Sequence, residues 1–215
     1  MAEVVSDNAV NAAFHAANDD SDSSFALREA HHRMANTLTL LAGALRRDLS
    51  GIADPSVRAI LHGHERRIVD FGDLHRHFSR GPVRGPVAVE EYVRPLCERL
   101  VGAILAPLGI RCEAFVGEGT LPGDKCESVG LIIAELVTNA AKHAFPAGAA
   151  GNVRVDLFER MDVWNCVVSD DGGGIRGGAA GAGSRILDML VRALNGRVEI
   201  RTGAAGTVVA VTFPQ

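Results

Sequence analysis

Residues 131–146 read LIIAELVTNAAKHAFP, and the organisation of the whole chain is clearest from this stretch. Its apolar residues form one stripe at helical spacing. Its polar residues fall three or four positions apart on another face: Glu135, Asn139, Lys142 and His143. A carboxylate, an amide and a cation on one helical face can hold a hydrated magnesium ion and the phosphates that it neutralises. The same spacing also describes an ordinary amphipathic helix with a solvated polar side, so the rest of the chain must decide between the two.

The composition is that of a globular protein. The chain has 215 residues, of which 47% are hydrophobic, and this is ample for a packed core. Its net charge of −4 includes no basic block, so nucleic-acid binding has no support. The four cysteines form no C-x-x-C pair, which favours a reducing compartment over a zinc site. Neither a membrane span nor a signal peptide is apparent, so we expect a cytoplasmic protein.

The first 23 residues lack an apolar face. They include the run NDDSDSS and are rich in Ala, Asn, Asp and Ser. We therefore expect residues 1–23 to be a flexible N-terminal tail whose end caps a helix at Ser23 or Ser24. So short a polar segment cannot bury a core, and we expect signal input to come from a separate protein.

Residues 24–79 are predicted to form two helices joined by a short turn. The first ends near Leu49, and Asp54 and Pro55 then suit the cap and the first position of the second. The predicted apolar seam of the first helix contains Leu27, His31, Met34, Leu38, Leu41 and Leu45, and that of the second contains Val57, Leu61, His64, Ile68, Phe71, Leu74 or His75, and Phe78. One antiparallel hairpin cannot bury this whole seam, so we expect a homodimer joined as a four-helix bundle.

His32 is the candidate phosphoryl acceptor on the first helix. His31 occupies the seam, whereas His32 is rotated by about 100° toward the shoulder of the bundle, where a partner can reach it. Glu29 lies three residues earlier, near enough to orient the imidazole or to take its proton. A neutral imidazole nitrogen is a competent nucleophile near pH 7. The alternative is that both histidines lie on the helix surface without a chemical task.

The remaining chain is predicted to be a separate domain. Residues 80–87 contain two Gly-Pro steps and no periodicity, which is typical of a linker. Over residues 88–215 helices and strands alternate, and this pattern predicts a two-layer α/β sandwich with one mixed sheet. Together with the hairpin, the fold class is α+β.

Two glycine-rich stretches of this domain are further candidate sites. A strand ending at Asp170 presents a carboxylate that can accept a hydrogen bond from an exocyclic amine, such as that of adenine. Gly172 and Gly174 would let a ring approach closely. The stretch GAGSRI, residues 181–186, opens a helix with glycine and suits phosphate oxygens. Each pattern alone also fits an ordinary turn.

The order of these pieces resembles that of bacterial sensor histidine kinases. EAHHRMANTLTLL resembles the phosphoacceptor box of the HWE-like branch, with its His-His-Arg. LIIAELVTNAAKHAFP is similar to the asparagine box of that branch, SDDGGG to its first glycine box and GAGSRILDMLVRALNG to its second. Ala35 stands where the branch usually has a lysine, and Ala182 and Ser184 stand where it usually has leucines.

This resemblance implies a dimerisation and phosphotransfer hairpin followed by an ATP-binding domain of the GHKL type. His32 would be phosphorylated from ATP and would pass the phosphoryl group to an aspartate in the receiver domain of a response regulator. Asn139 would bind Mg2+, Glu135 would hold a water of its shell, and Asp170 would take the adenine amine. The other residues implied to lie at the site are Lys142, His143, Gly172, Gly174, Gly183 and Thr207.

Three interpretations stay open at this level. The first is a histidine kinase that uses ATP and magnesium. The second is a histidine phosphotransferase with a degenerate ATP-binding domain, in which His32 relays phosphoryl groups between regulators. The third is a GHKL ATPase or protein kinase that acts on another protein. Glu135, Asn139 and Asp170 together favour the first, because a module without ATP has no need of them. The short, featureless stretch after Gly174 favours the second.

Overall fold

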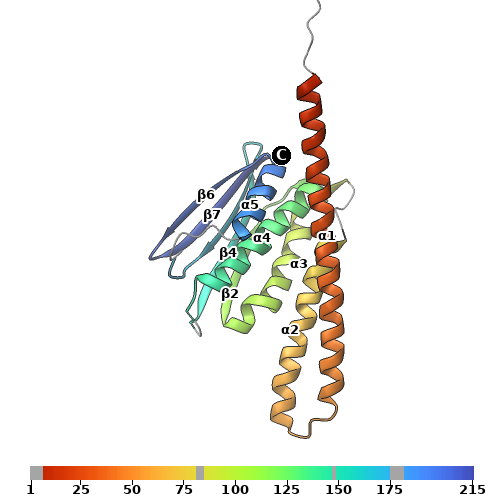
Figure 1. Ribbon diagram of the computed structural model, residues 1–215. Helices are drawn as coiled ribbons and strands as arrows, with labels where there is room; N and C mark the ends of the chain where they lie inside the picture. The colour runs from red at the N-terminus through yellow and green to blue at the C-terminus, as the bar shows by residue number, and fades with distance from the viewer. Residues whose placement is uncertain (1–6, 81–84, 147–148, 175–181) are drawn as a thin grey trace, which may run out of the picture.

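A long helical hairpin lies beside a two-layer domain (Figure 1). The structure is a computed structural model and describes residues 7–80, 85–146, 149–174 and 182–215. Its helices are α1 (Asp7–Leu49), α2 (Pro55–Ser79), α3 (Val89–Leu100), α4 (Gly123–His143) and α5 (Ala182–Ala193), with a π-helical turn at Val101–Leu105 and a 3-10 turn at Ala106–Leu108. Its strands are β1 (Pro86–Ala88), β2 (Ile110–Val116), β3 (Thr120–Pro122), β4 (Gly151–Arg160), β5 (Val163–Asp170), β6 (Arg197–Gly203) and β7 (Gly206–Pro214).

The start of α1 differs from the sequence prediction. The helix begins at Asp7 and runs through Ser23 and Ser24, so neither serine is its N-cap and residues 7–23 are helical. Adding residues to an existing helix avoids the cost of nucleation, so even a polar segment can continue it. The start of α2 confirms the prediction: Asp54 is the N-cap, and its Oδ1 accepts hydrogen bonds from the backbone N–H groups of Ser56 and Val57 at 2.8 and 3.3 Å.

The contact line between α1 and α2 also differs from the predicted seam. Ala35, Ala42 and Leu49 are buried at intervals of seven residues, whereas Met34 and Leu41 are 47% and 52% exposed. The predicted seam residues His31, Leu38 and Leu45 are half-buried, so the line keeps these positions and shifts by one residue only where Ala35 and Ala42 replace Met34 and Leu41. On α2, Val57 and His64 are likewise exposed, but the rest of the predicted seam is confirmed as buried or half-buried: Leu61, Ile68, Phe71, Leu74, His75 and Phe78.

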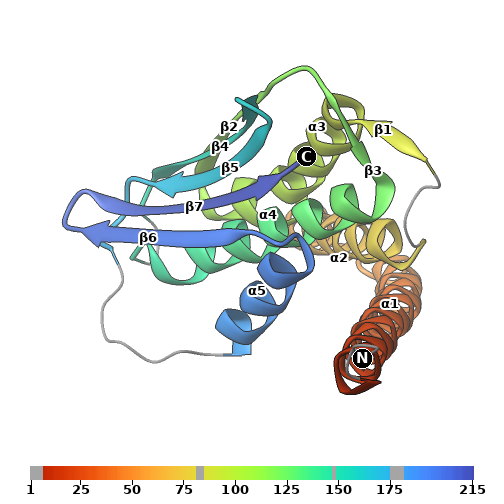
Figure 2. The same ribbon diagram turned by 90° about the horizontal axis from the view of Figure 1, so that it is seen from above.

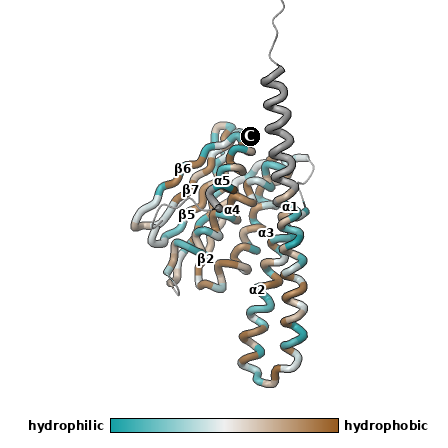
Figure 3. The backbone as a smooth tube through the Cα atoms, in the orientation of Figure 1, coloured by the Kyte–Doolittle hydropathy of each residue, from teal (hydrophilic) through white to brown (hydrophobic). Residues whose placement is uncertain are grey.

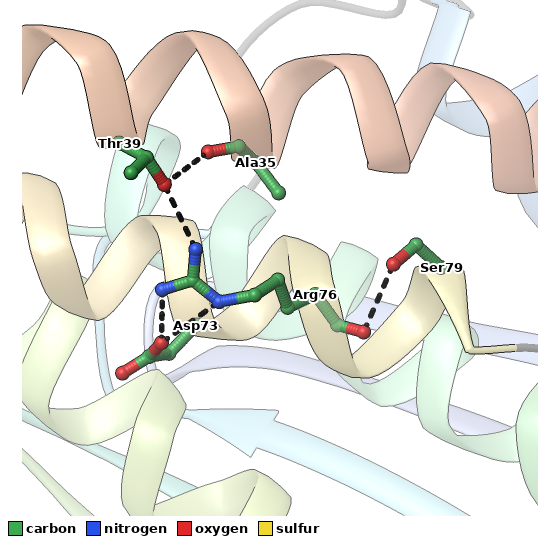
Figure 4. Close-up of polar contacts among 5 residues, drawn as sticks. All are labelled: Ala35, Thr39, Asp73, Arg76 and Ser79. Atoms are coloured by element: carbon green, nitrogen blue, oxygen red, sulfur yellow. Dashed lines mark hydrogen bonds and ion pairs between the residues drawn. The ribbon is translucent and has the colours of Figure 1, made fainter.

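Polar bonds cross the hairpin as well. In Figure 4, a guanidinium nitrogen of Arg76 donates to Thr39 Oγ1 at 2.9 Å, and Arg76 also pairs with Asp73 on its own helix. Nearer the turn, Arg46 Nε donates to the carboxylate of Glu65 at 2.7 Å. Glu65 is 7% exposed, so this ion pair compensates the charge of a carboxylate with little access to water.

The second domain is the predicted two-layer sandwich. Its five-stranded sheet has the order β2-β4-β5-β7-β6, with β2 parallel to β4 and the other neighbours antiparallel. Figure 2 shows α3, α4 and α5 on one face of this sheet. Side chains alternate along the strands, so Leu157, Trp164 and Phe213 are fully buried against the helices. Hydrophilic and hydrophobic residues alternate along α2 and α3, as expected for helices with one buried face (Figure 3).

The hairpin and the second domain share a hydrophobic core. Leu74 and Phe78 of α2 belong to the same buried cluster as α3 and the sheet, and the rings of His77 and Tyr92 lie 5.0 Å apart. Of the predicted linker 80–87, residues 81–84 lie outside the described part of the chain, and β1, which pairs with β3, begins inside the predicted linker.

No helix in the described part of the chain is both long enough and apolar enough to cross a membrane. The four cysteines are free thiols, and burial raises the pKa of each.

Candidate functional site

The helix α4 separates an apolar face from a polar one, as its sequence predicts. Ile132, Leu136 and Ala140 are buried, whereas Glu135 and Asn139 are half-buried on another face. The Nδ2 group of Asn139 donates to Glu135 Oε1 at 3.1 Å, so the two side chains meet over one helical turn. In the last turn of the helix, Lys142 and His143 are exposed.

Asp170 ends β5 between two neighbouring strands. It lies opposite Val153 of β4 and Thr207 of β7. Its Oδ1 accepts hydrogen bonds from the backbone N–H groups of Gly172 at 3.0 Å and Thr207 at 3.2 Å. Within the described residues, Oδ2 makes no hydrogen bond, so one oxygen fixes the carboxylate while the other stays available to a ligand. The predicted neighbours Asp170 and Thr207 therefore meet.

The glycine turn after Asp170 lies against α4. A Cβ at Gly172 would come within 2.3 Å of the carbonyl oxygen of Ala144, and Gly173 donates its N–H to that oxygen at 2.8 Å. Gly174 has a φ of +71°, and a Cβ there would come within 2.4 Å of the carbonyl oxygen of Gly203. Gly172 and Gly174 therefore make room for the chain's own backbone, and contact with a nucleotide stays a prediction. The turn brings Asp170 to the C-terminal end of α4.

Helix α1 distinguishes the two adjacent histidines. His31 is half-buried, with its Nδ1 2.8 Å from Nδ1 of His75, so one ring donates and the other accepts. Burial, and the nearby His75, lower the pKa of His31 to about 4. His32, in contrast, is exposed. Of the two, His32 is the one that a partner can reach.

The structure brings Glu29 to Arg33, not to His32. Arg33 Nε donates to Glu29 Oε1 at 2.8 Å, and between these described side chains Glu29 makes no hydrogen bond to His32. A glutamate followed four residues later by an arginine is a favourable helical pair, which explains why the carboxylate turns this way.

His32 lies apart from the α4 site. Burial raises the pKa of Glu127, near the start of α4, and the positive charge of Arg28 on α1 opposes this shift, so α1 passes the first part of α4. Asn139 follows twelve residues later, about 18 Å further along the helix. The structure thus places the Asp170 turn and Thr207 at the C-terminal end of α4, the helix that carries Glu135 and Asn139, but it does not bring His32 to them.

Two known families match successive parts of this architecture. Residues 29–104, which hold most of the hairpin, match the family described as histidine kinase. Residues 125–215 match the family described as histidine kinase-, DNA gyrase B-, and HSP90-like ATPase. The two matches occur in the order that the phosphoacceptor and nucleotide boxes predict. The chain belongs to the histidine kinase family.

Curated relatives of this histidine kinase chain are longer than it is. The sensor histidine kinase PdtaS of Mycobacterium tuberculosis is 30% identical over 197 residues, which cover 87% of this chain and 39% of that protein. The blue-light-activated histidine kinase 2 of Erythrobacter litoralis is 26% identical over 208 residues, which cover 87% of this chain and 56% of that protein. The chain thus spans about two fifths to just over half of these relatives.

Solved structures support the fold of this histidine kinase chain. The histidine kinase domain from the Erythrobacter litoralis EL346 blue-light-activated histidine kinase aligns with a TM-score of 0.59 at 20% identity, covering 90% of this chain and 94% of that domain. A structure titled as a bacterial phosphotransferase aligns with a TM-score of 0.65 at 11% identity, covering 88% and 95%. At these identities the likeness concerns the fold alone.

One residue pair at the site was missed by the sequence reasoning. Asp171 Oδ1 accepts from the backbone N–H of Asn152 at 2.7 Å, and Oδ2 accepts from Asn152 Nδ2 at 2.6 Å. The second aspartate of the Asp-Asp pair was a visible signal, but its partner is known only once β4 and β5 are paired in register.

The remaining predicted site residue, Gly183, lies in the first turn of α5. Sequence alone had placed it at the opening of this helix, and the structure agrees. Its contact with phosphate oxygens stays a prediction.

Proposed function

We propose that this chain transfers the γ-phosphoryl group of ATP to His32 and then to an aspartate of a response-regulator receiver domain. One observation carries the proposal: an exposed histidine on the hairpin accompanies a domain in which the Asp170 turn packs against the C-terminal end of the helix that carries Glu135 and Asn139. Membership of the histidine kinase family supports it.

The donor set at the end of α4 fits a magnesium-bound nucleotide. Asn139 Nδ2 donates a hydrogen bond to Glu135, so the amide oxygen of Asn139 is available to bind a hard cation. Asn139 would hold the ion through this oxygen, and Glu135 would hold a water of its shell. Asp170 would accept the adenine amine on Oδ2. Bound magnesium supplies neutralisation of the phosphate charge. We place Lys142 and His143 near the phosphates.

His32 acts as the nucleophile. A bond forms between an imidazole nitrogen and the γ-phosphorus, the bond from that phosphorus to the bridging oxygen breaks, and ADP leaves. The other ring nitrogen gives up its proton. Glu29 remains the proposed base, and it would have to leave its Arg33 partner to accept this proton. Because His32 lies apart from Asn139, transfer requires either movement of the domain against the hairpin or a second chain.

Labelled ATP tests this function. Purified chain would be incubated with labelled ATP and Mg2+, beside His32→Ala and Asn139→Ala variants and a His64→Ala control, since His64 is another exposed histidine of the hairpin. Acid-labile label is expected on the unaltered chain and on the His64 control and absent from the other two. Label that survives the His32 change would assign the acceptor elsewhere.

The relay interpretation keeps one supporting observation. Only seven residues, 175–181, separate Gly174 from α5, which is short for a segment that covers a nucleotide. In the same assay, a chain that binds no ATP but accepts label on His32 from a phosphorylated receiver domain would favour the phosphotransferase. ATP binding or hydrolysis without label on His32 would favour a GHKL ATPase or a protein kinase with another substrate.

A further inference from the structure

We propose that Asp171 and Asn152 are positioning residues. Their hydrogen bonds hold the backbone of Asp170 so that its carboxylate faces the amine of the adenine. The inference rests on the proposed ATP site and adds two residues to it. Asn152 lies outside the motifs that mark the site in the sequence, and Asp171 lies within SDDGGG without a role assigned to it there. Neither residue is proposed to touch the nucleotide.

Asn152 and Asp171 extend the hydrogen bonding between β4 and β5 by one position beyond the end of the paired strands. The last backbone pair between β4 and β5 joins Val153 to Asp170, and the next position would join Asn152 to Asp171. There the chain turns away into the glycine turn. The Asp171 carboxylate then accepts the Asn152 backbone N–H at 2.7 Å, in the place that a strand carbonyl would take.

Two more bonds lock the same position. Asn152 Nδ2 donates to Asp171 Oδ2 at 2.6 Å, and the N–H of Asp171 donates to the carbonyl oxygen of Asn152 at 3.2 Å. Three bonds thus join two residues in both directions. A carboxylate that accepts two N–H donors makes strong, charge-assisted hydrogen bonds. These bonds lower the pKa of Asp171, so its carboxylate is charged at neutral pH.

These bonds also restrict the backbone of the preceding residue, Asp170. The N–H of Asp171 belongs to the peptide group that follows Asp170, so holding this group limits rotation of the Asp170 backbone. On its other side, Asp170 is held by Gly172 and Thr207 through Oδ1. A released peptide group would leave the carboxylate with fewer constraints, and its second oxygen would no longer point in one direction toward an exocyclic amine.

The ratio of the affinities for ATP and GTP reports whether the Asp170 carboxylate is correctly positioned. Asp170 favours ATP, which offers an amine, over GTP, which offers a carbonyl oxygen at the equivalent place. A merely structural defect reduces the fraction of folded protein and weakens ATP and GTP equally. A displaced carboxylate lowers the ratio of the two affinities.

The test variants remove, or exchange, the two partners of the hydrogen bond between the Asn152 amide and the Asp171 carboxylate. Asp171→Ala removes both acceptors, and Asn152→Asp sets two carboxylates against each other. The double variant, Asn152→Asp with Asp171→Asn, restores an amide facing a carboxylate. Asp156→Asn is the control, because Asp156 bonds Arg154 on the same sheet without touching the glycine turn.

Affinities for ATP and GTP with Mg2+ would be measured by titration calorimetry on the full chain. We expect each single variant to lower the ATP-to-GTP preference by about tenfold, the free energy of roughly one hydrogen bond. The double variant should recover most of the preference, and the control should keep it. Unchanged preference in the single variants, or failure of the double variant to recover it, overturns the positioning role while leaving ATP binding intact. An unaltered chain that binds neither nucleotide overturns the proposed function and this inference together.

Discussion

Three half-buried histidines of the hairpin are held neutral by their surroundings. Burial lowers the pKa of His31, His75 and His77, to about 4 for the first and the last. Around His77, the positive charges of Arg99 and Arg80 add to the effect of burial. Its buried Nε2 has no hydrogen-bond partner among the described residues, so a proton there would gain no acceptor.

This arrangement predicts acid sensitivity. A histidine whose folded pKa is below its unfolded value of about 6.5 stabilises the fold above pH 6.5, and this stabilisation is lost as pH falls toward 4. His77→Phe keeps a ring beside Tyr92 and cannot titrate. Urea unfolding at pH 7.5, 6 and 5 should show a smaller loss of unfolding free energy on acidification for this variant than for the unaltered chain. His64→Gln, at an exposed position, should retain the full loss; equal slopes in all three chains would contradict the assignment.

At the scale of single residues, sequence reasoning succeeded where the signal was local. The bond between Asn139 and Glu135 follows from a spacing of four on one helix. The roles of Asp171 and of Glu29 could not be predicted in the same way. The first depends on which residue of another strand lies opposite, and the second on a competition with Arg33 for one carboxylate.

Among the elements, the β6–β7 hairpin supports Asp170 from beneath. Gly206 has a φ of +117°, and a Cβ there would come within 1.9 Å of the carbonyl oxygen of Asp170. No side chain fits without moving the strand end that carries the proposed adenine contact.

We expect Gly206→Ala to destabilise the fold by at least about 2 kcal/mol, because strain and a backbone clash act together. Gly203→Ala in the same turn is a matched control, since a Cβ there meets nothing within 4 Å. Thermal unfolding followed by circular dichroism would compare them. Similar melting temperatures for the two variants would argue against the close packing at Gly206.

Helix and strand types were predictable from periodicity, whereas the contact line between helices was not. Asp54 and Pro55 mark the start of α2 by local chemistry. The burial of Ala35 and Ala42 in place of Met34 and Leu41 depends on how the two helices face each other, which apolar spacing does not encode. The early start of α1 was missed because composition predicted a tail, while propagation from a stable helix favours continuation.

On the scale of the molecule, apolar side chains remain exposed along the outer hairpin. They are Met34, Leu40, Leu41, Val57 and Ile60. A helical hairpin with such a surface supports the proposed pairing of two chains.

Leu41→Glu combined with Ile60→Glu should therefore convert a dimer into a monomer, because two buried charges without partners on each chain oppose association. We expect the dimer dissociation constant to rise by at least about 100-fold. Sedimentation velocity over a range of concentrations would measure it. Met161→Glu changes an equally apolar, 83% exposed residue in the β4–β5 turn and should leave the dimer intact. A monomeric unaltered chain would rule out the pairing.

The shared core of hairpin and domain has a thermodynamic consequence. Exposing Leu74 and Phe78 would cost about 1.5–3 kcal/mol for each side chain, and the sum approaches the whole stability of a small domain. We therefore expect the hairpin and the domain to unfold together, in a single cooperative transition. A fragment that begins after α2 would expose to water the apolar surface that α2 covers. A fragment that ends with α2 would expose the side chains of Leu74 and Phe78.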